Sequence, residues 1–144
     1  MRPLTLLLLA MALAATLILS GCGGGTLLLG KDDEIKIGAD AAAEFDKENH
    51  VDRTSPLARR ISDIGLRVAA QADPPAYPYS FTLVRDDTVN AFAFPGGRIY
   101  IYEGLINEVG NDTDAIAWVL GHETTHIQQR HSAKAIERAI GATA

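Results

Sequence analysis

The sequence predicts an α+β fold in which two N-terminal helices precede a small antiparallel β-meander and a long C-terminal helix. Three patterns predict it: apolar residues at helical spacing before residue 72, apolar-polar alternation between residues 79 and 102, and a capped helical pattern from residue 114 to about residue 140. A chain of 144 residues has room for one domain. We therefore expect one compact unit after any leader is removed.

The first 30 residues have the layout of a secretory signal followed by a tether. Arg2 supplies a positive charge, and the stretch from Leu4 to Leu19 is almost continuously apolar. Leu19-Ser20-Gly21-Cys22 resembles a bacterial lipobox, in which the cysteine is acylated after cleavage before it. We expect residues 1–21 to be a lipoprotein signal peptide, Cys22 to be lipidated and residues 22–30 to be flexible. An uncleaved membrane span and a signal with an unmodified cysteine are the alternatives.

The residue after the cysteine indicates where the anchor resides. Gly23 stands there rather than Asp, which by resemblance to sorted lipoproteins favours the outer membrane over the inner membrane. Several acyl chains hold a protein at a bilayer far more strongly than one does. We expect a lipid-anchored protein of the cell envelope, on the periplasmic face of the outer membrane.

Charge and cysteine content exclude other classes. The chain carries a net charge of −5, and no Lys/Arg cluster is suited to neutralising phosphates, so nucleic acid is not an expected partner. Cys22 is the single cysteine, so an internal disulfide cannot form.

Two helices are predicted at the start of the mature chain. Residues 32–49 carry a modest apolar stripe, and Ser55-Pro56 forms a favourable cap for a second helix that extends to residue 72. The two apolar stripes are Ile35, Gly38, Ala42 and Phe45 in the first helix, and Leu57, Ile61, Ile64 and Val68 in the second. Each stripe needs a partner, so we expect the two helices to pack together as scaffold.

Three strands are predicted next. Prolines between residues 74 and 78 end the second helix, and residues 79–84 then alternate as in a half-buried strand. A turn at Asp86-Asp87 leads to a strand at 89–94, and Pro95-Gly96-Gly97 leads to a strand at 98–102. Short turns between sequential strands favour an antiparallel meander.

The long helix carries a His-Glu-x-x-His pattern. Asn111-Asp112-Thr113 caps the helix, with a short helical turn at 104–109 before it. His122 and His126 are four residues apart, so their imidazoles lie on one face where both can reach one tetrahedral metal ion. Glu123 flanks that face and is the candidate general base that activates zinc-bound water. The alternative is a pair of surface histidines on a solvated face.

Several blocks of sequence resemble one family. They are Asn90-Ala91-Phe92-Ala93-Phe94-Pro95-Gly96-Gly97-Arg98-Ile99-Tyr100, Gly104-Leu105-Ile106, Gly121-His122-Glu123-Thr124-Thr125-His126 and Arg130-His131. Together they are similar to the gluzincin zinc peptidases that include the CAAX prenyl-protein proteases and HtpX, in the branch of periplasmic lipoproteins that process or assist outer-membrane proteins. The resemblance covers residues 32–139.

The resemblance implies an activity and a binding mode. It implies a zinc-dependent metalloendopeptidase, with one Zn²⁺ per chain, that hydrolyses peptide bonds of misfolded or envelope proteins. Strand 98–102 would lie beside the helix and offer its edge to an extended substrate. The implied substrate-binding residues are Asn90, Arg98, Ile99 and Tyr100. Phe92 and Phe94 fit either a substrate site or the core.

The third zinc ligand is missing from the pattern. In the resembled family it is a glutamate on a later helix, tens of residues beyond the motif. His131 is rotated by about 140° from His126 on an unbroken helix, and Glu137 lies almost three turns along it, so neither is expected to be a ligand. We expect residues 31–144 to form the N-terminal part of a zinc metallopeptidase domain, apparently truncated.

Two residues that depart from the family pattern leave a second function open. Thr124 and Thr125 replace the aliphatic and small residues usual at these positions, and Thr125 is expected to crowd the neighbouring strand. The alternative function is a non-catalytic, chaperone-like lipoprotein that holds unfolded clients at its strand edge.

Overall fold

The structure is a computed structural model that describes residues 29–72 and 77–141. Its α+β architecture confirms the predicted fold class. The predicted signal peptide, the lipidation of Cys22, the tether up to residue 28 and the start of the proline-rich stop at 73–76 lie outside the described residues. None of the helices in the described ranges is both long and apolar enough to span a bilayer.

The elements follow from local sequence signals. Ser55 caps α3 by accepting a hydrogen bond from the Ala58 N–H at 3.0 Å, and Asp112 caps α5 by accepting one from the Ala115 N–H at 2.8 Å. The helices are α2 (Lys31–Glu48), α3 (Pro56–Ala69), α4 (Glu103–Glu108), α5 (Thr113–Gln128) and α6 (His131–Gly141). The strands are β1 (Val51–Asp52), β2 (Ser80–Val84), β3 (Ala91–Phe94) and β4 (Arg98–Tyr102).

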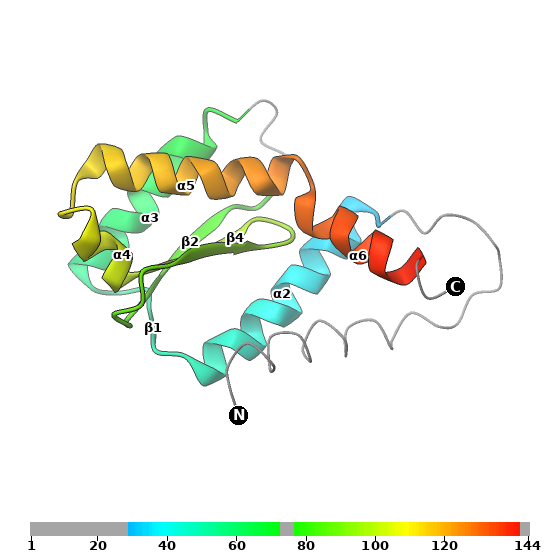
Figure 1. Cartoon of the computed structure of the whole chain (residues 1–144), viewed down its shortest axis with the longest axis horizontal. Helices are drawn as coiled ribbons and strands as arrows, with labels where there is room; N and C mark the ends of the chain where they lie inside the picture. The colour runs from blue at the N-terminus through cyan, green and yellow to red at the C-terminus, as the bar shows by residue number, and fades with distance from the viewer. Residues whose placement is uncertain (1–28, 73–76, 142–144) are drawn as a thin grey trace.

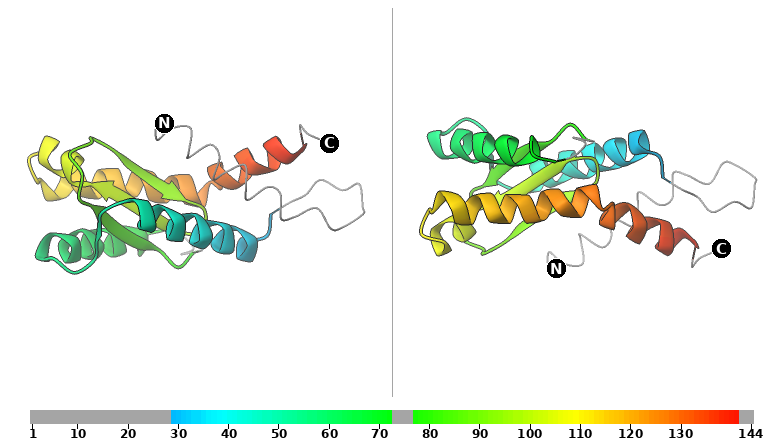
Figure 2. Two further views of the ribbon diagram at one scale, coloured as in Figure 1. Left: turned by 90° about the horizontal axis from the view of Figure 1, so that it is seen from below. Right: turned by 90° about the horizontal axis from the view of Figure 1, so that it is seen from above.

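The elements form three layers. In Figure 1, α3 and α5 lie over one face of the sheet and α2 crosses the other. The view from above in Figure 2 shows α3 and α5 side by side, while the view from below shows α2 in front of the strands. The larger core lies between α3, α5 and the sheet, and a smaller aromatic core of Phe45, Phe92 and Tyr100 lies under α2.

The predicted antiparallel meander is wrong in its pairing. The strand order is β1-β2-β4-β3, and β2 pairs with β4 in parallel, from Ser80 opposite Arg98 to Val84 opposite Tyr102. Only the β3–β4 hairpin has the expected antiparallel pairing. The connection from β2 to β3 therefore crosses the position that β4 later fills, and β3 lies at the edge of the sheet. β4 is paired on both sides, so it does not offer the free edge that we expected of it.

The expected packing of the first two helices against each other is also wrong. α2 buries its stripe on the aromatic face of the sheet, where Ala42 and Phe45 contact the smaller core. α3 lies on the other face, and the ring of Phe81 on β2 fills the space beside Gly65. A sheet has two faces to cover, and each helix covers one of them.

The predicted single helix from residue 114 to residue 140 is broken. α5 ends at Gln128, and α6 starts at His131 after Arg130 adopts a left-handed backbone conformation with φ of 56°. Residues 122–140 contain neither the Gly nor the Pro that commonly signals a helix end. α6 continues from α5 in a new direction, as Figure 2 shows.

The packed structure begins before the predicted start at Lys31. Leu29 is buried, and its backbone N–H donates to Glu137 Oε1 at 2.9 Å. The end of the predicted tether is thus fixed against α6.

The close contact between α2 and the β3–β4 turn generates a stability prediction. A Cβ atom at Gly38 would lie 1.7 Å from the Pro95 carbonyl oxygen, so Gly38→Ala should lower the free energy of unfolding by about 1–3 kcal/mol. The matched control is Gly121→Ala in α5, where a Cβ would meet Val68 Cγ1 at an ordinary 3.5 Å. In that variant the free energy of unfolding should rise by about 0.5–1 kcal/mol, because Ala favours the helix more than Gly does. Urea denaturation measures both changes, and equal effects would contradict the predicted close approach.

Candidate metal centre

α5 has a buried face that fixes it to the core. Ile116, Leu120, Thr124 and Ile127 are its buried residues, and they recur at helical spacing. On the sheet side, Ala91 and Ala93 of β3 pack against the same core and are small, so the helix can approach the edge strand closely. The opposite side of α5 therefore projects its side chains from a rigid support.

His122 and His126 lie together on the accessible side of α5. Their Nε2 atoms are 2.9 Å apart, and their rings are almost perpendicular with centroids 4.5 Å apart. Two nitrogens that share a tetrahedral zinc ion would be about 3.3 Å apart, so a small side-chain adjustment brings both within range of one ion. The donor set fits zinc, for which imidazole nitrogen is a common ligand.

Trp118 is a site neighbour that the sequence reasoning missed. Its indole stacks on the His122 ring, with centroids 5.7 Å apart and planes 16° apart, although Trp118 is 73% exposed. The sequence feature that could have identified Trp118 is its position one helical turn before His122. The stacking restricts the rotation of the His122 ring.

Glu123 is half-buried beside the histidines. Burial of its carboxyl group raises the pKa of Glu123, and the nearby His126 and His122 partly offset this by favouring the carboxylate. A carboxylate with a raised pKa is a stronger proton acceptor. The structure thus places a half-buried carboxyl group with a raised pKa beside the two histidines.

The two threonines of the motif are accommodated within the helix. Thr124 Oγ1 donates to the Leu120 carbonyl at 2.7 Å, and Thr125 Oγ1 donates to the Gly121 carbonyl at 2.9 Å. Thr125 is exposed, so the expectation that it crowds the neighbouring strand is wrong. Thr124 is the residue that faces the core.

A buried ion pair holds the break after α5. Glu34 of α2 is 2% exposed, and its Oε1 accepts a hydrogen bond from Arg130 Nε at 2.6 Å. Its Oε2 accepts one from the Tyr77 hydroxyl at 2.9 Å. Burial, together with the Glu34 carboxylate, raises the pKa of Tyr77 to about 12. Arg130 Nη2 also donates to the Leu29 carbonyl at 2.5 Å, so one guanidinium joins three segments. We call Glu34, Tyr77 and Arg130 the clamp.

The break brings His131 to the site. His131 Nδ1 lies 2.6 Å from His126 Nδ1, and the ring centroids are 4.8 Å apart. Our expectation for His131 assumed an unbroken helix, and that assumption is wrong. His131 nevertheless approaches the nitrogen of His126 that faces away from His122.

The predicted substrate residues are divided between the sheet and its edge. Ile99 and Tyr100 are buried in β4, which is paired on both sides, whereas Asn90 immediately precedes the edge strand β3. A small hollow is lined by Ala93 of β3 together with His126 and Arg130. The strand edge next to the histidines is therefore that of β3.

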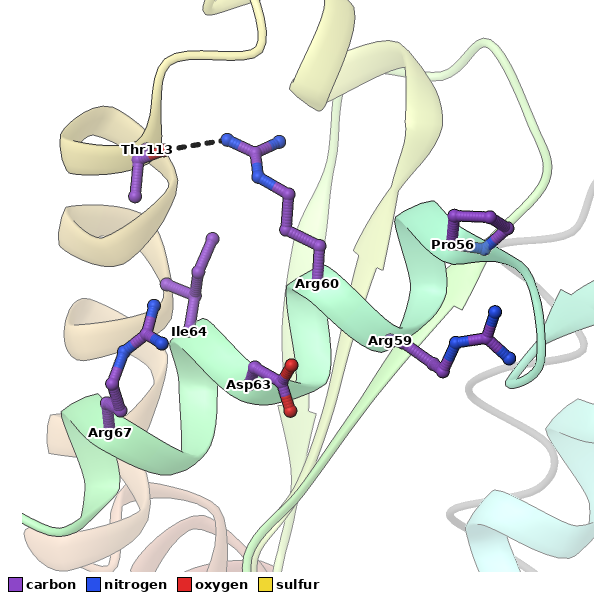
Figure 3. A pocket seen from close by; sticks show the side chains of 7 residues that line it. All are labelled: Pro56, Arg59, Arg60, Asp63, Ile64, Arg67 and Thr113. Carbon is purple, nitrogen blue, oxygen red and sulfur yellow. Dashed lines mark hydrogen bonds between the residues drawn. The ribbon is translucent and has the colours of Figure 1, made fainter.

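A larger hollow of about 430 Å³ lies elsewhere, on α3. Figure 3 shows its lining, in which Arg60 reaches across to Thr113 at the start of α5. Arg60 also binds Asn111, so this arginine joins α3 to the cap of α5. Thr113 precedes His122 by nine residues, about 14 Å along the helix, so the hollow is separate from the histidines.

The described residues bring together two candidate metal ligands, His122 and His126. Among residues 29–72 and 77–141, no group of three or more His, Cys, Asp or Glu side chains is arranged to hold a metal. Glu137 accepts hydrogen bonds from Leu29 N and Arg130 rather than facing the histidines.

Comparison with known proteins assigns the family. The model of peptidase family M48 matches residues 56–143, which include α3, the sheet strands β2–β4 and the histidine pair. The chain belongs to peptidase family M48. This agrees with the resemblance seen in the sequence blocks.

Several named proteases are similar to part of the chain. The β-barrel assembly-enhancing proteases of Yersinia pestis and Escherichia coli are 40% and 36% identical over 81 residues, which is 56% of this chain and 16% of each relative. The mitochondrial metalloendopeptidase OMA1 of Schizosaccharomyces pombe is 35% identical over 81 residues, 56% of this chain and 24% of the relative. The chain thus spans less than a quarter of the length of these relatives.

The clamp generates a prediction about stability in this M48 chain. Arg130→Met should lower the free energy of unfolding by about 3 kcal/mol, because it leaves the Glu34 carboxylate buried with only Tyr77 as a partner. Glu34→Gln should have a smaller effect, because the remaining Arg130 is one-third exposed and can be hydrated. The exposed Arg59→Met is the control and should change stability by less than about 0.5 kcal/mol. Denaturant unfolding measures the free energy of unfolding of each variant and so checks this order. An Arg130→Met variant as stable as the control would refute the stabilising role of the clamp.

Proposed function

We propose that this chain carries the catalytic helix of a zinc-dependent metalloendopeptidase of the bacterial envelope. The observation that carries the proposal is the pair of Nε2 atoms of His122 and His126, 2.9 Å apart, beside Glu123 on a helix packed against an edge strand. Membership of peptidase family M48 supports the reaction class.

His122 and His126 would hold one zinc ion through their Nε2 atoms. When bound, zinc supplies Lewis acidity that polarises the scissile carbonyl and acidifies water at its open position. Glu123 would accept the proton of the attacking water and deliver it to the leaving amine. Its raised pKa suits both steps, because the group must bind the proton and then release it.

The edge of β3 would hold the substrate. Asn90 O accepts the Tyr102 N–H at 3.0 Å, so by the alternation of an antiparallel ladder the N–H and C=O groups of Ala91 and Ala93 point away from β4. An extended peptide could pair with these groups as an added strand. Ala93 lines the same hollow as His126, which supports delivery of a backbone carbonyl to the metal side of α5. Backbone recognition would make selectivity for side chains loose.

The expected substrates are unfolded or misassembled envelope proteins. The bacterial relatives are named for enhancing β-barrel assembly, which supports a role at the outer membrane. Lipidation of Cys22 would anchor the chain on the periplasmic face of that membrane. Asn90 and Arg98 remain the accessible candidates for contact with substrate.

Replacing Glu123 tests the proposal. In the 144-residue chain purified in detergent and loaded with zinc, Glu123→Gln should reduce hydrolysis of unfolded casein at least about 100-fold, because the general base is lost. Zinc binding should persist in this variant, whereas His126→Ala should lose it. Isothermal titration with Zn²⁺ and a peptide-release assay give the two readouts.

The same experiment separates a peptidase from a holding chaperone. A chaperone would suppress aggregation of an unfolded outer-membrane protein equally well as the wild-type chain and as the Glu123→Gln variant, and neither form would release peptides. That result, or the absence of zinc binding in the wild-type chain, would refute the proposed activity.

A further inference from the structure

The contact between His126 and His131 depends on the helix break. His131 is the first residue of α6, and Arg130 before it has the left-handed conformation that turns α6 away from the α5 axis. On a continuous helix, the two rings would be rotated apart by about 140°. In the structure their Nδ1 atoms are 2.6 Å apart, which is hydrogen-bonding distance.

The positions of the ring protons decide which histidine donates and which accepts the hydrogen bond in this contact. Each neutral imidazole has one N–H donor and one acceptor nitrogen. For His126 to offer a lone pair at Nε2, where it faces His122, its proton must sit on Nδ1. The acceptor for that proton is then Nδ1 of His131, which carries its own proton on Nε2. The opposite arrangement would place the proton of His126 on Nε2 and block coordination.

We propose that His131 is a positioning residue that accepts a hydrogen bond from His126 Nδ1–H and so keeps Nε2 of His126 free for the metal. The inference rests on the proposed function, since it gives His131 a part in the same metal site. Partners of this kind fix both the tautomer and the orientation of a ligating histidine, and losing them lowers metal affinity about 10- to 100-fold.

The geometry excludes His131 as the third ligand of the same ion. The two nitrogens of an imidazole point in different directions, and His131 contacts the one that faces away from His122. The two predicted ligands thus have different supports. Trp118 stacks on His122 from within α5, and His131 contacts His126 from α6.

The position of His131 is itself determined at a distance. The clamp holds Arg130 to Glu34, and Ala133 on the first turn of α6 is buried. Leu29 N donates to Glu137 further along α6, which ties the helix to the N-terminal segment. His131 is exposed, so its ring is placed by the backbone that precedes it rather than by packing around it.

Two substitutions at one position test the inference. His131→Leu removes the acceptor, and His131→Asn retains one in its side-chain carbonyl oxygen. In the 144-residue chain in detergent, titration with Zn²⁺ should show affinity about 10- to 100-fold weaker for His131→Leu and close to wild type for His131→Asn. The control is His50→Leu, which removes an exposed histidine remote from α5 and should not alter the affinity.

A spectroscopic readout distinguishes positioning from a structural role. In ¹⁵N-histidine spectra of the zinc-loaded chain, the Nδ1–H proton of His126 should exchange slowly with water in the wild type and in His131→Asn. It should exchange rapidly in His131→Leu, while the unfolding midpoint stays unchanged because His131 is exposed.

The outcomes separate this inference from the proposed function. Wild-type zinc affinity in His131→Leu, or equal weakening in His131→Asn and His131→Leu, would overturn the positioning role and leave the metallopeptidase proposal standing. A wild-type chain that binds no zinc would overturn both. The expected result is weaker zinc affinity in His131→Leu alone, together with rapid exchange of the His126 Nδ1–H proton in that variant.

Discussion

A buried carboxylate on α2 determines how α5, the helix with the histidine pair, ends. Glu34 is almost completely removed from water, and a charge in that position needs a charged or hydrogen-bonding partner. Arg130 provides it only by leaving the α5 helix in a left-handed conformation, which by itself is unfavourable for a side chain with a Cβ atom. The ion pair compensates for that conformation, and the direction of α6 and the place of His131 follow. A helix on one face of the sheet thereby shapes the site on the other.

The close approach of α2 is what brings Glu34 within reach. Gly38 lies against the Pro95 carbonyl, and the β3–β4 turn contacts the same stretch of α2 through Gly96, whose positive φ of 79° suits a residue without a side chain. The same turn sets the register of β3 beside β4, with Phe94 opposite Arg98. The edge strand and the clamp are thus placed by one contact between small residues. This explains why the Pro-Gly-Gly turn matters to a site to which it contributes no functional group.

Local patterns were sufficient to predict some features and insufficient for others. Asp112 and Ser55 cap helices as predicted, because a cap depends on residues only a few positions apart. The histidine pair also needs only the helical period. The parallel pairing of β2 with β4 and the pair of Glu34 with Arg130, 96 residues apart, depend on tertiary contacts that leave no periodic signal in the sequence. The helix break was missed for the same reason, since neither Gly nor Pro marks it.

The proposed metal site is exposed on a single helix, so its candidate ligands would need support from nearby side chains. His122 is accessible to solvent, and the imidazole of a histidine on a helix surface can rotate about two bonds, which lowers metal affinity through lost entropy on binding. Stacking on Trp118 and the contact with His131 each restrict one ring before the ion arrives. Because the described residues offer two candidate ligands, this preorganisation would count for more than it would in a closed site of four ligands. The large exposed area of Trp118 is then explained by its position over the candidate ligand His122 rather than by packing in the core.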